Sequence, residues 1–156
     1  MSEAKTVKQS QARMTQLVLP DETNQLGNLL GGQLMHWIDL VAAIAAMRHA
    51  RKVCVTASVD EINFINPVKQ GEVVTLLASV NRVFTTSMEI GVSVSAENLL
   101  TGETHHTNSA YLTFVAIDEQ GRPVPVDPIV CEDDGEIRRF NEALHRRELR
   151  LQRRIK

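Results

Sequence analysis

The sequence predicts an α+β domain in which one long, buried helix packs against an antiparallel sheet. Residues 33–50 are apolar around most of a helical circumference, and such a helix is buried rather than laid on a surface. Residues 53–117 change to alternating segments rich in β-branched side chains, which favour strands. Short turns join these segments, and strands joined in this way pair antiparallel. A sheet with one apolar helix on its face forms an α+β layer arrangement.

The N-terminal part of the chain leads into this helix. Residues 1–7 are polar, and we expect them to form a flexible N-terminus before a domain over residues 8–130. Residues 13–19 favour a strand that Pro20 ends. The helix should begin near Gly31 and Gly32 and end at about Ala50.

Four strands and a second helix complete the prediction. The expected strands are residues 53–64, 73–84, 88–96 and 104–117. Residues 131–156 form a C-terminal helical extension, because apolar side chains recur there at helical spacing. One central helix covers only one face of the sheet. Open edges and an uncovered face favour oligomerisation, most often as a twofold dimer.

Composition excludes several classes of protein. The 156 residues suffice for one domain with a sizeable core, and a net charge of -2 gives no general attraction to nucleic acid. The longest apolar run, residues 40–47, is too short to cross a membrane, and the polar N-terminus is not a signal peptide. Two cysteines without a CxxC pair are typical of a reducing cytosol. We therefore expect a cytoplasmic protein with no nucleic-acid or membrane partner.

Asp39 is the unusual residue of the helix, because it places a carboxylate in an apolar run. Pairing with Arg48 or with a residue on another element would be a structural explanation. A carboxylate can also activate water or attack a carbonyl directly. The helix N-terminus at Gly31 and Gly32 offers free backbone N–H groups for a developing oxyanion, and the glycines permit close approach. Asn24 is either a turn residue or a group that orients water.

Several short motifs occur together in this order. They are Asn24-x-x-Gly27, Gly31-Gly32, Met35-x-x-x-Asp39, the run from Thr56 to Phe64, Pro67-Val68-x-x-Gly71 and Thr86-Ser87-Met88-Glu89. With this set, residues 8–130 resemble the hotdog-fold acyl-CoA thioesterases of the cytosolic acyl-CoA hydrolase type. The resemblance implies a sheet wrapped around the central helix. It also implies a hydrolase that converts fatty acyl-CoA to free fatty acid and coenzyme A.

The resemblance further implies the site and its assembly. The functional pair of the family falls on Asp39 and Asn24, at an interface between two hotdog units. A homodimer with two equivalent sites would be the active unit, and dimers of the family commonly form trimers of dimers, hence a homohexamer. We favour Asp39 as general base, while a covalent anhydride intermediate stays open. The backbone of Gly31 and Gly32 would hold the oxyanion.

Other residues are weaker candidates. Asn63 and Ser87 could line the acyl-CoA groove, and Arg48, Lys69 and Arg82 could meet the phosphates of coenzyme A. We assign no cofactor and no metal, because the adjacent His105 and His106 point to opposite faces of a strand. A serine-esterase mechanism is not indicated, since no serine lies in a GxSxG context.

Two alternative functions remain at this point. A hotdog dehydratase would act on hydroxyacyl thioesters with a histidine and an acid, and only His36 lies close before Asp39. A non-catalytic hotdog module would bind acyl-CoA and have no need of Asp39. The preferred acyl chain length does not follow from the sequence.

Overall fold

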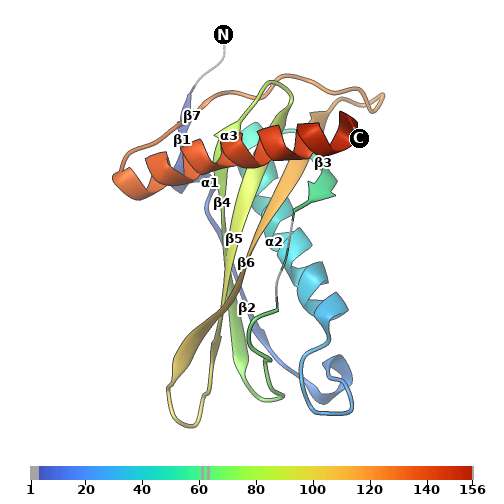
Figure 1. Ribbon diagram of the computed structural model, residues 1–156, viewed down its shortest axis with the longest axis vertical. Helices are drawn as coiled ribbons and strands as arrows, with labels where there is room; N and C mark the ends of the chain where they lie inside the picture. Colours follow the sequence, from blue (N-terminus) through green and yellow to red (C-terminus); the bar gives the residue numbers. More distant parts are fainter. Residues whose placement is uncertain (1–3, 61, 63, 156) are drawn as a thin grey trace.

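A five-stranded antiparallel sheet forms the body of the protein. The computed structural model describes residues 4–60, 62 and 64–155. The strands lie in the order β2-β4-β5-β6-β3, all pairs antiparallel, which confirms the predicted fold class (Figure 1). Their bounds are β2 Ala12–Leu17, β3 Val53–Val59, β4 Val73–Val83, β5 Ser87–Glu97 and β6 Thr104–Ile117. β2 and β3 are the two edges of the sheet.

The central helix α2, Gly31–Ala50, packs on the inner face of the sheet. It has the predicted length and ends where Arg51 takes a left-handed conformation, with φ of 53°. The inner face alternates as the sequence of β5 predicts. Buried side chains of this layer include Leu76, Met88, Ile90, Val92, Val94, Leu112 and Phe114. Removing each such side chain from water contributes about 1.5–3 kcal/mol, so this layer is the main source of stability.

β3 is shorter than predicted. The expected strand ran to residue 64, but the ladder with β6 ends at Val59. The next amide, Asp60 N–H, makes one last bond to the Tyr111 carbonyl, at 2.8 Å. Beyond it the chain leaves the sheet. Apolar β-branched residues persist in the sequence after Val59, and β6 itself continues to Thr104, so neither the local pattern nor the length of the partner strand ends the ladder there.

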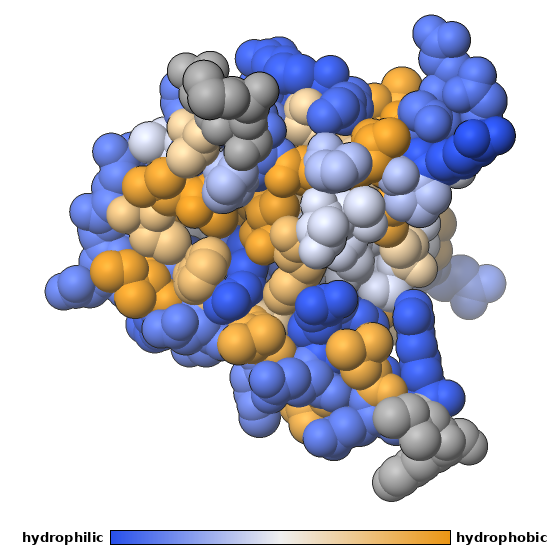
Figure 2. Space-filling model, turned by 90° about the horizontal axis from the view of Figure 1, so that it is seen from above, coloured by the Kyte–Doolittle hydropathy of each residue, from blue (hydrophilic) through white to orange (hydrophobic). Residues whose placement is uncertain are grey.

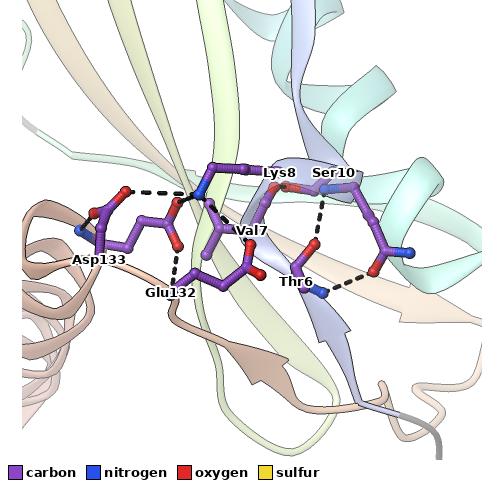
Figure 3. Close-up of polar contacts among 8 residues, drawn as sticks. Thr6, Val7, Lys8, Ser10, Glu132 and Asp133 are labelled. Carbon is purple, nitrogen blue, oxygen red and sulfur yellow. Dashed lines mark hydrogen bonds and ion pairs between the residues drawn. The ribbon is translucent and has the colours of Figure 1, made fainter.

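The N-terminal segment is more ordered than predicted. Residues that the sequence places in or beside a flexible lead-in form a short strand β1, Lys5–Thr6, and a helical turn α1, Val7–Ser10. β1 pairs in parallel with β7, Ile129–Val130. Val7 is buried, and a capping box between Thr6 and Gln9 fixes the start of α1 (Figure 3). One buried valine and one cap are too weak a sequence pattern to predict this turn.

A third correction concerns the outer face of the sheet, which was expected to be uncovered. The C-terminal helix α3, Asp134–Ile155, crosses the strands on this face, opposite α2 (Figure 1). Polar outward residues lie beneath it. Glu89 is 1% exposed and Asn81 is 2% exposed. α3 covers only part of this face, since the outward Leu77 of β4 is 48% exposed and an open cavity lies beside Ser79, Asn81 and Tyr111. The covered parts of the two faces differ in chemistry, apolar beneath α2 and polar beneath α3.

Apolar side chains also reach the surface. On the flank of α2 and along the edge strand β3 they are Leu40, Ile44, Met47, Val53, Val55 and Val59. The end of the molecule that carries both termini shows apolar side chains interspersed with hydrophilic ones (Figure 2). The edge at β3 thus leaves apolar surface and unpaired strand groups open together, a combination that favours pairing with another chain. No described helix is long and apolar enough to span a bilayer.

Candidate active site

Asp39 lies in the middle of α2, where its carboxylate meets the edge strand. Thr56 Oγ1 of β3 donates a hydrogen bond to Asp39 Oδ1 at 2.7 Å. Asp39 is half-buried and Thr56 is exposed, so the pair is open to solvent. Of the two structural explanations that the sequence allowed, a pair with Arg48 does not occur, since Arg48 Nη1 donates to the Gln11 carbonyl. The other, a partner on another element, is met by Thr56 through a hydrogen bond and without a cation. No cation of the described residues lies within ion-pair distance of Asp39.

The register of β3 explains why Thr56 faces the helix. Thr56 pairs with Phe114, which is buried on the inner face. A bulge follows directly, because the next paired residue is Ser58, opposite Thr113. Bulges re-aim side chains at sheet edges. Sequence reasoning missed Thr56 as a site residue. Thr56 belongs to the motif from Thr56 to Phe64, but its contact with Asp39 of α2 becomes visible only in the folded chain.

The second group of site residues surrounds the start of α2. Asn24 follows a short helical turn, η1 Pro20–Glu22, and closes a tight loop. Its Oδ1 accepts from the N–H groups of Leu26, at 2.9 Å, and Asn28, at 3.1 Å. Asn24 thus has the turn role that the sequence also allowed, while its amide nitrogen has no acceptor among the described residues. A cavity of about 310 Å³ opens here, lined by Asn24, Asn28, Leu29, Gly31, Leu34, Phe64, Asn66, Pro67 and Val68.

Gly31 and Gly32 form the first turn of α2 beside this cavity. Leu30 caps the helix without a side-chain hydrogen bond. The N–H groups of both glycines find no acceptor in the described parts of the chain, as expected for the first turn of a helix. A Cβ on Gly32 would meet no atom within 4 Å. These amides are free to bind an anionic oxygen, which the helix dipole would stabilise further.

The two groups are separated along the helix. Asp39 lies seven and eight residues beyond the two glycines, and a rise of 1.5 Å per residue gives roughly 10–12 Å. A carbonyl held by the amides of Gly31 and Gly32 is therefore out of reach of Asp39 in the same chain. Within one chain, the carboxylate of Asp39 and the amides of Gly31 and Gly32 therefore do not meet.

The predicted cations lie apart from one another. Arg82 stacks on the ring of Phe140, 3.9 Å from its centroid, and donates to the Phe140 carbonyl beneath α3. Arg48 lies near the C-terminal end of α2 and lines an outer cavity of about 670 Å³ with Arg13 and Arg139. Lys69 is exposed and follows Val68 of the helix-mouth cavity.

Ser87 and Asn63 are the two polar residues that were predicted to line the acyl-CoA groove. Ser87 begins β5 opposite Val115, in outward register, while the inner face carries Met88. Asn63 lies outside the described residues. The structure thus does not gather the four described groove candidates into one site, and the role of all five stays a prediction.

Other reactive groups are unsuited to nucleophilic or metal chemistry. Burial raises the pKa of the Cys54 thiol to about 11, so it carries little thiolate near neutral pH. His106 Nε2 lies 3.2 Å from Ser109 Oγ on an exposed strand surface, and neither side chain hydrogen-bonds to a third group among the described residues. Within the described ranges, no three His, Cys, Asp or Glu side chains gather to hold a metal ion.

Comparison with known proteins identifies the family. The model of the thioesterase superfamily matches residues 26–103, the span from the Asn24 loop to the β5–β6 turn. The chain belongs to the thioesterase superfamily. The thioesterase chain is 43% identical over 144 residues to an uncharacterized acyl-CoA thioester hydrolase, YkhA, of Bacillus subtilis, covering 92% of this chain and 84% of that one.

Solved structures agree with this assignment and with a hotdog fold for the thioesterase. An acyl-CoA hydrolase from Staphylococcus aureus, in complex with butyryl coenzyme A and coenzyme A, is 37% identical with a TM-score of 0.92. The match covers 98% of this chain and 93% of the Staphylococcus aureus chain. A hexameric acyl-CoA thioesterase without ligand is 40% identical with a TM-score of 0.94, over 97% of both chains.

Variants of the Staphylococcus aureus enzyme are also among the structures similar to this thioesterase. In them an aspartate, an asparagine and a threonine are each replaced by alanine. The asparagine variant is in complex with coenzyme A.

Proposed function

We propose that this thioesterase hydrolyses fatty acyl-CoA to free fatty acid and coenzyme A, with Asp39 as the general base. The observation that carries the proposal is the carboxylate of Asp39. It interrupts an apolar helix, is fixed by Thr56 at 2.7 Å, and has no ion-pair partner among the described residues. A fixed carboxylate that is open to solvent and free of a cation can accept a proton from water. Acyl-CoA thioester hydrolysis itself is the activity named for relatives over nearly the whole chain.

The spacing of the residues supports the same group. The asparagine, aspartate and threonine replaced in the Staphylococcus aureus enzyme follow one another at intervals of 15 and 17 residues. Asn24, Asp39 and Thr56 follow one another at the same two intervals. We therefore assign to these three residues the positions studied in that enzyme.

In the proposed reaction Asp39 takes a proton from water as the water oxygen attacks the thioester carbonyl. The N–H groups of Gly31 and Gly32 hold the oxyanion that forms on the carbonyl oxygen. Asn24 orients the water or the carbonyl through its free amide nitrogen. The carbon–sulfur bond then breaks, and the proton on Asp39 passes to the departing thiolate of coenzyme A. Thr56 keeps the carboxylate directed at the water throughout.

The active unit in this proposal is a homodimer. The separation of roughly 10–12 Å along α2 keeps Asp39 from the amides of its own helix. Two antiparallel copies would bring Asp39 of one chain to Asn24, Gly31 and Gly32 of the other. The apolar flank of α2 and the open edge β3 supply the surface for this contact.

Three such dimers would form a hexamer. Hexameric assembly is named for two of the similar thioesterases, one of them from Yersinia pestis. We expect the protein to act in the cytoplasm, as do the cytosolic acyl coenzyme A thioester hydrolases of rat and mouse by name. Of the predicted cations, Lys69 is best placed for a phosphate of coenzyme A, because it is exposed beside the helix-mouth cavity.

The direct test is thiol release from an acyl-CoA series, comparing wild type with Asp39→Ala. Loss of the base should lower kcat by about 10²–10⁴-fold. His36→Ala is the matched control, since His36 is exposed on the same helix and has no place in the mechanism. Activity of Asp39→Ala near the wild-type level would refute the role of Asp39. Binding of acyl-CoA by the wild type without turnover would favour the non-catalytic module.

Isotope labelling separates the two routes for Asp39. In a single turnover in ¹⁸O-water, a general base puts the label directly into the fatty acid. Direct attack by Asp39 would form an anhydride, and water attack on its aspartyl carbonyl would put label into Asp39 and leave an unlabelled enzyme oxygen in the fatty acid. We expect labelled fatty acid and an unlabelled Asp39. A hydroxyacyl-CoA converted to an enoyl thioester with no thiol release would instead favour the dehydratase.

A further inference from the structure

The C-terminal helix α3 is attached to the sheet by a buried ion pair. Arg146 Nε donates to Glu89 Oε2 at 3.0 Å, and Nη2 donates to Glu89 Oε1 at 2.7 Å. The Glu89 side chain is 1% exposed. The guanidinium also lies over the ring of Tyr111, 3.6 Å from its centroid. Such a two-point, stacked contact fixes the orientation of the helix as well as its position.

One turn further along α3, a second arginine reaches the segment that leaves β3. Arg150 Nη1 donates to Asp60 Oδ2 at 3.2 Å. The two side chains are 15% and 16% exposed, so solvent screens this pair less than a surface pair. Asp60 is also tied to the sheet, since its N–H bonds to the Tyr111 carbonyl. Arg146 and Arg150 thus act on the same place, the end of β3 beside Tyr111.

Asp60 stands midway between the two halves of the candidate site. Four residues before it, Thr56 holds the carboxylate of Asp39. Four residues after it, the Phe64 ring lies 3.5 Å from where a Cβ on Gly31 would be, and lines the cavity beside Asn24. Phe64 itself is 54% exposed, so burial does little to hold its ring in place. Further along, Val68 is buried and its carbonyl accepts from the Leu29 N–H at 2.7 Å, so Asp60 and Val68 anchor the chain on the two sides of Phe64.

The far end of α3 is fixed as well. Lys8 lies 3.2 Å from Glu136, 3.5 Å from Glu132 and 3.6 Å from Asp133, at the start of the helix (Figure 3). The Asp133 carboxylate caps the helix by accepting from the Glu136 N–H at 2.8 Å. A helix held at its start and again at Arg146 presents Arg150 at a defined position.

We propose that the ion pair between Arg150 and Asp60 makes α3 a brace for the acyl-CoA site, which anchors the chain at Asp60 and thereby keeps Phe64 against the mouth of α2. Arg150 is then a positioning residue, because it acts through Asp60 and touches no substrate. The proposal gives a function to a helix that lies outside the matched span 26–103. It rests on the proposed thioester hydrolysis only for its kinetic consequence.

The test compares Arg150→Gln, Asp60→Asn and the exchanged pair Asp60→Arg/Arg150→Asp with wild type. Arg154→Gln is the matched control, because Arg154 is exposed on the same helix. Each single variant should lower kcat/KM for acyl-CoA by about tenfold, chiefly through KM, since small displacements of positioning groups have effects of this order. The exchanged pair should recover to within about threefold of wild type, and Arg154→Gln should not change.

Hydrogen exchange supplies a readout independent of activity. Peptides that span residues 60–68 should exchange faster in Arg150→Gln than in Arg154→Gln, while peptides of α2 should not change. Unaltered exchange and unaltered KM in a folded Arg150→Gln protein would overturn the proposal. The proposal would also be overturned if the variants lost activity only in proportion to a lower melting temperature, because the loss would then reflect unfolding. A wild-type protein without thiol release would refute the proposed function, and the exchange measurement would still test the brace.

Discussion

The two faces of the sheet bury side chains in opposite ways. On the inner face, apolar residues of β4, β5 and β6 meet the apolar surface of α2. On the outer face, α3 covers Glu89 and Asn81, and arginines stack on Phe140 and Tyr111. The side chains directly beneath both helices are shielded from water. One layer does so without directional bonds, and the other depends on a small number of oriented contacts.

Because of this difference, the inner layer mainly stabilises the fold, whereas the outer layer mainly fixes the position of α3. Apolar burial is non-directional, so the inner layer holds α2 on the sheet but tolerates small shifts. A bidentate ion pair tolerates little displacement, so the outer layer fixes where α3 lies. The candidate site lies where both are needed. Asp39 belongs to the inner layer, and the segment after β3 is tied to the outer one through Asp60.

The largest effect on stability should come from the inner face. Leu76 is fully buried in β4, and Leu76→Ala should lower the free energy of unfolding by about 4 kcal/mol. The neighbouring Leu77 points outward and is 48% exposed, so Leu77→Ala should cost less than about 1 kcal/mol. Urea unfolding at one protein concentration measures both. Equal losses at the two positions would contradict the distinction between the faces.

A somewhat smaller effect should follow from breaking the outer ion pair. Arg146→Gln leaves the Glu89 carboxylate buried without its cation and should cost about 3 kcal/mol. The double variant Glu89→Gln/Arg146→Met removes the charge and keeps an acceptor for the Asn81 amide. It should be more stable than Arg146→Gln in the same unfolding experiment. A double variant that is less stable than the single one would mean that the charges themselves stabilise the layer.

The smallest effect concerns His49, a buried polar residue in the last turn of α2. Burial lowers the pKa of His49 below its ordinary value of 6.5, although its bond to the Asp127 carbonyl opposes this. The unfolded chain therefore binds a proton more readily than the folded one. Stability should fall as pH decreases below about 6.5, and level off below the folded pKa.

Unfolding measured from pH 8 to pH 5 tests this sign. His49→Gln keeps a donor for the Asp127 carbonyl and removes the titration, so its stability should depend less on pH over this range. A steeper dependence in the variant than in wild type would show that other groups are responsible.

The sequence predicted the inner layer well and the outer layer poorly. Alternation in residues 88–96 and the apolar run of α2 identify buried positions directly. Nothing in the local pattern marks Glu89 as buried, since a charged residue on an alternating strand normally faces water. Its partner Arg146 is 57 residues away, and only folding brings the two together.

The same limit applies to the candidate site. The motifs singled out Asp39, Asn24, Gly31 and Gly32 by residue type and spacing. They did not reveal that Thr56 fixes Asp39. The distance of Asp39 from the amides of its own helix, by contrast, follows from its spacing of seven and eight residues from the glycines. The cations predicted for coenzyme A lie on separate parts of the surface, because charge alone in a sequence does not say where a side chain is used.

The sequence by itself determined the class of fold, the length of the central helix and the acid at its centre. These features depend on local periodicity and on the rarity of a carboxylate in an apolar run. Both can be recognised within one segment of the sequence. The tertiary structure decided which face each helix covers, where β3 ends and what holds Asp39 and Asp60. Those depend on pairs of residues distant in the chain, such as Asp39 with Thr56 and Asp60 with Arg150, and local sequence carries no record of such pairs.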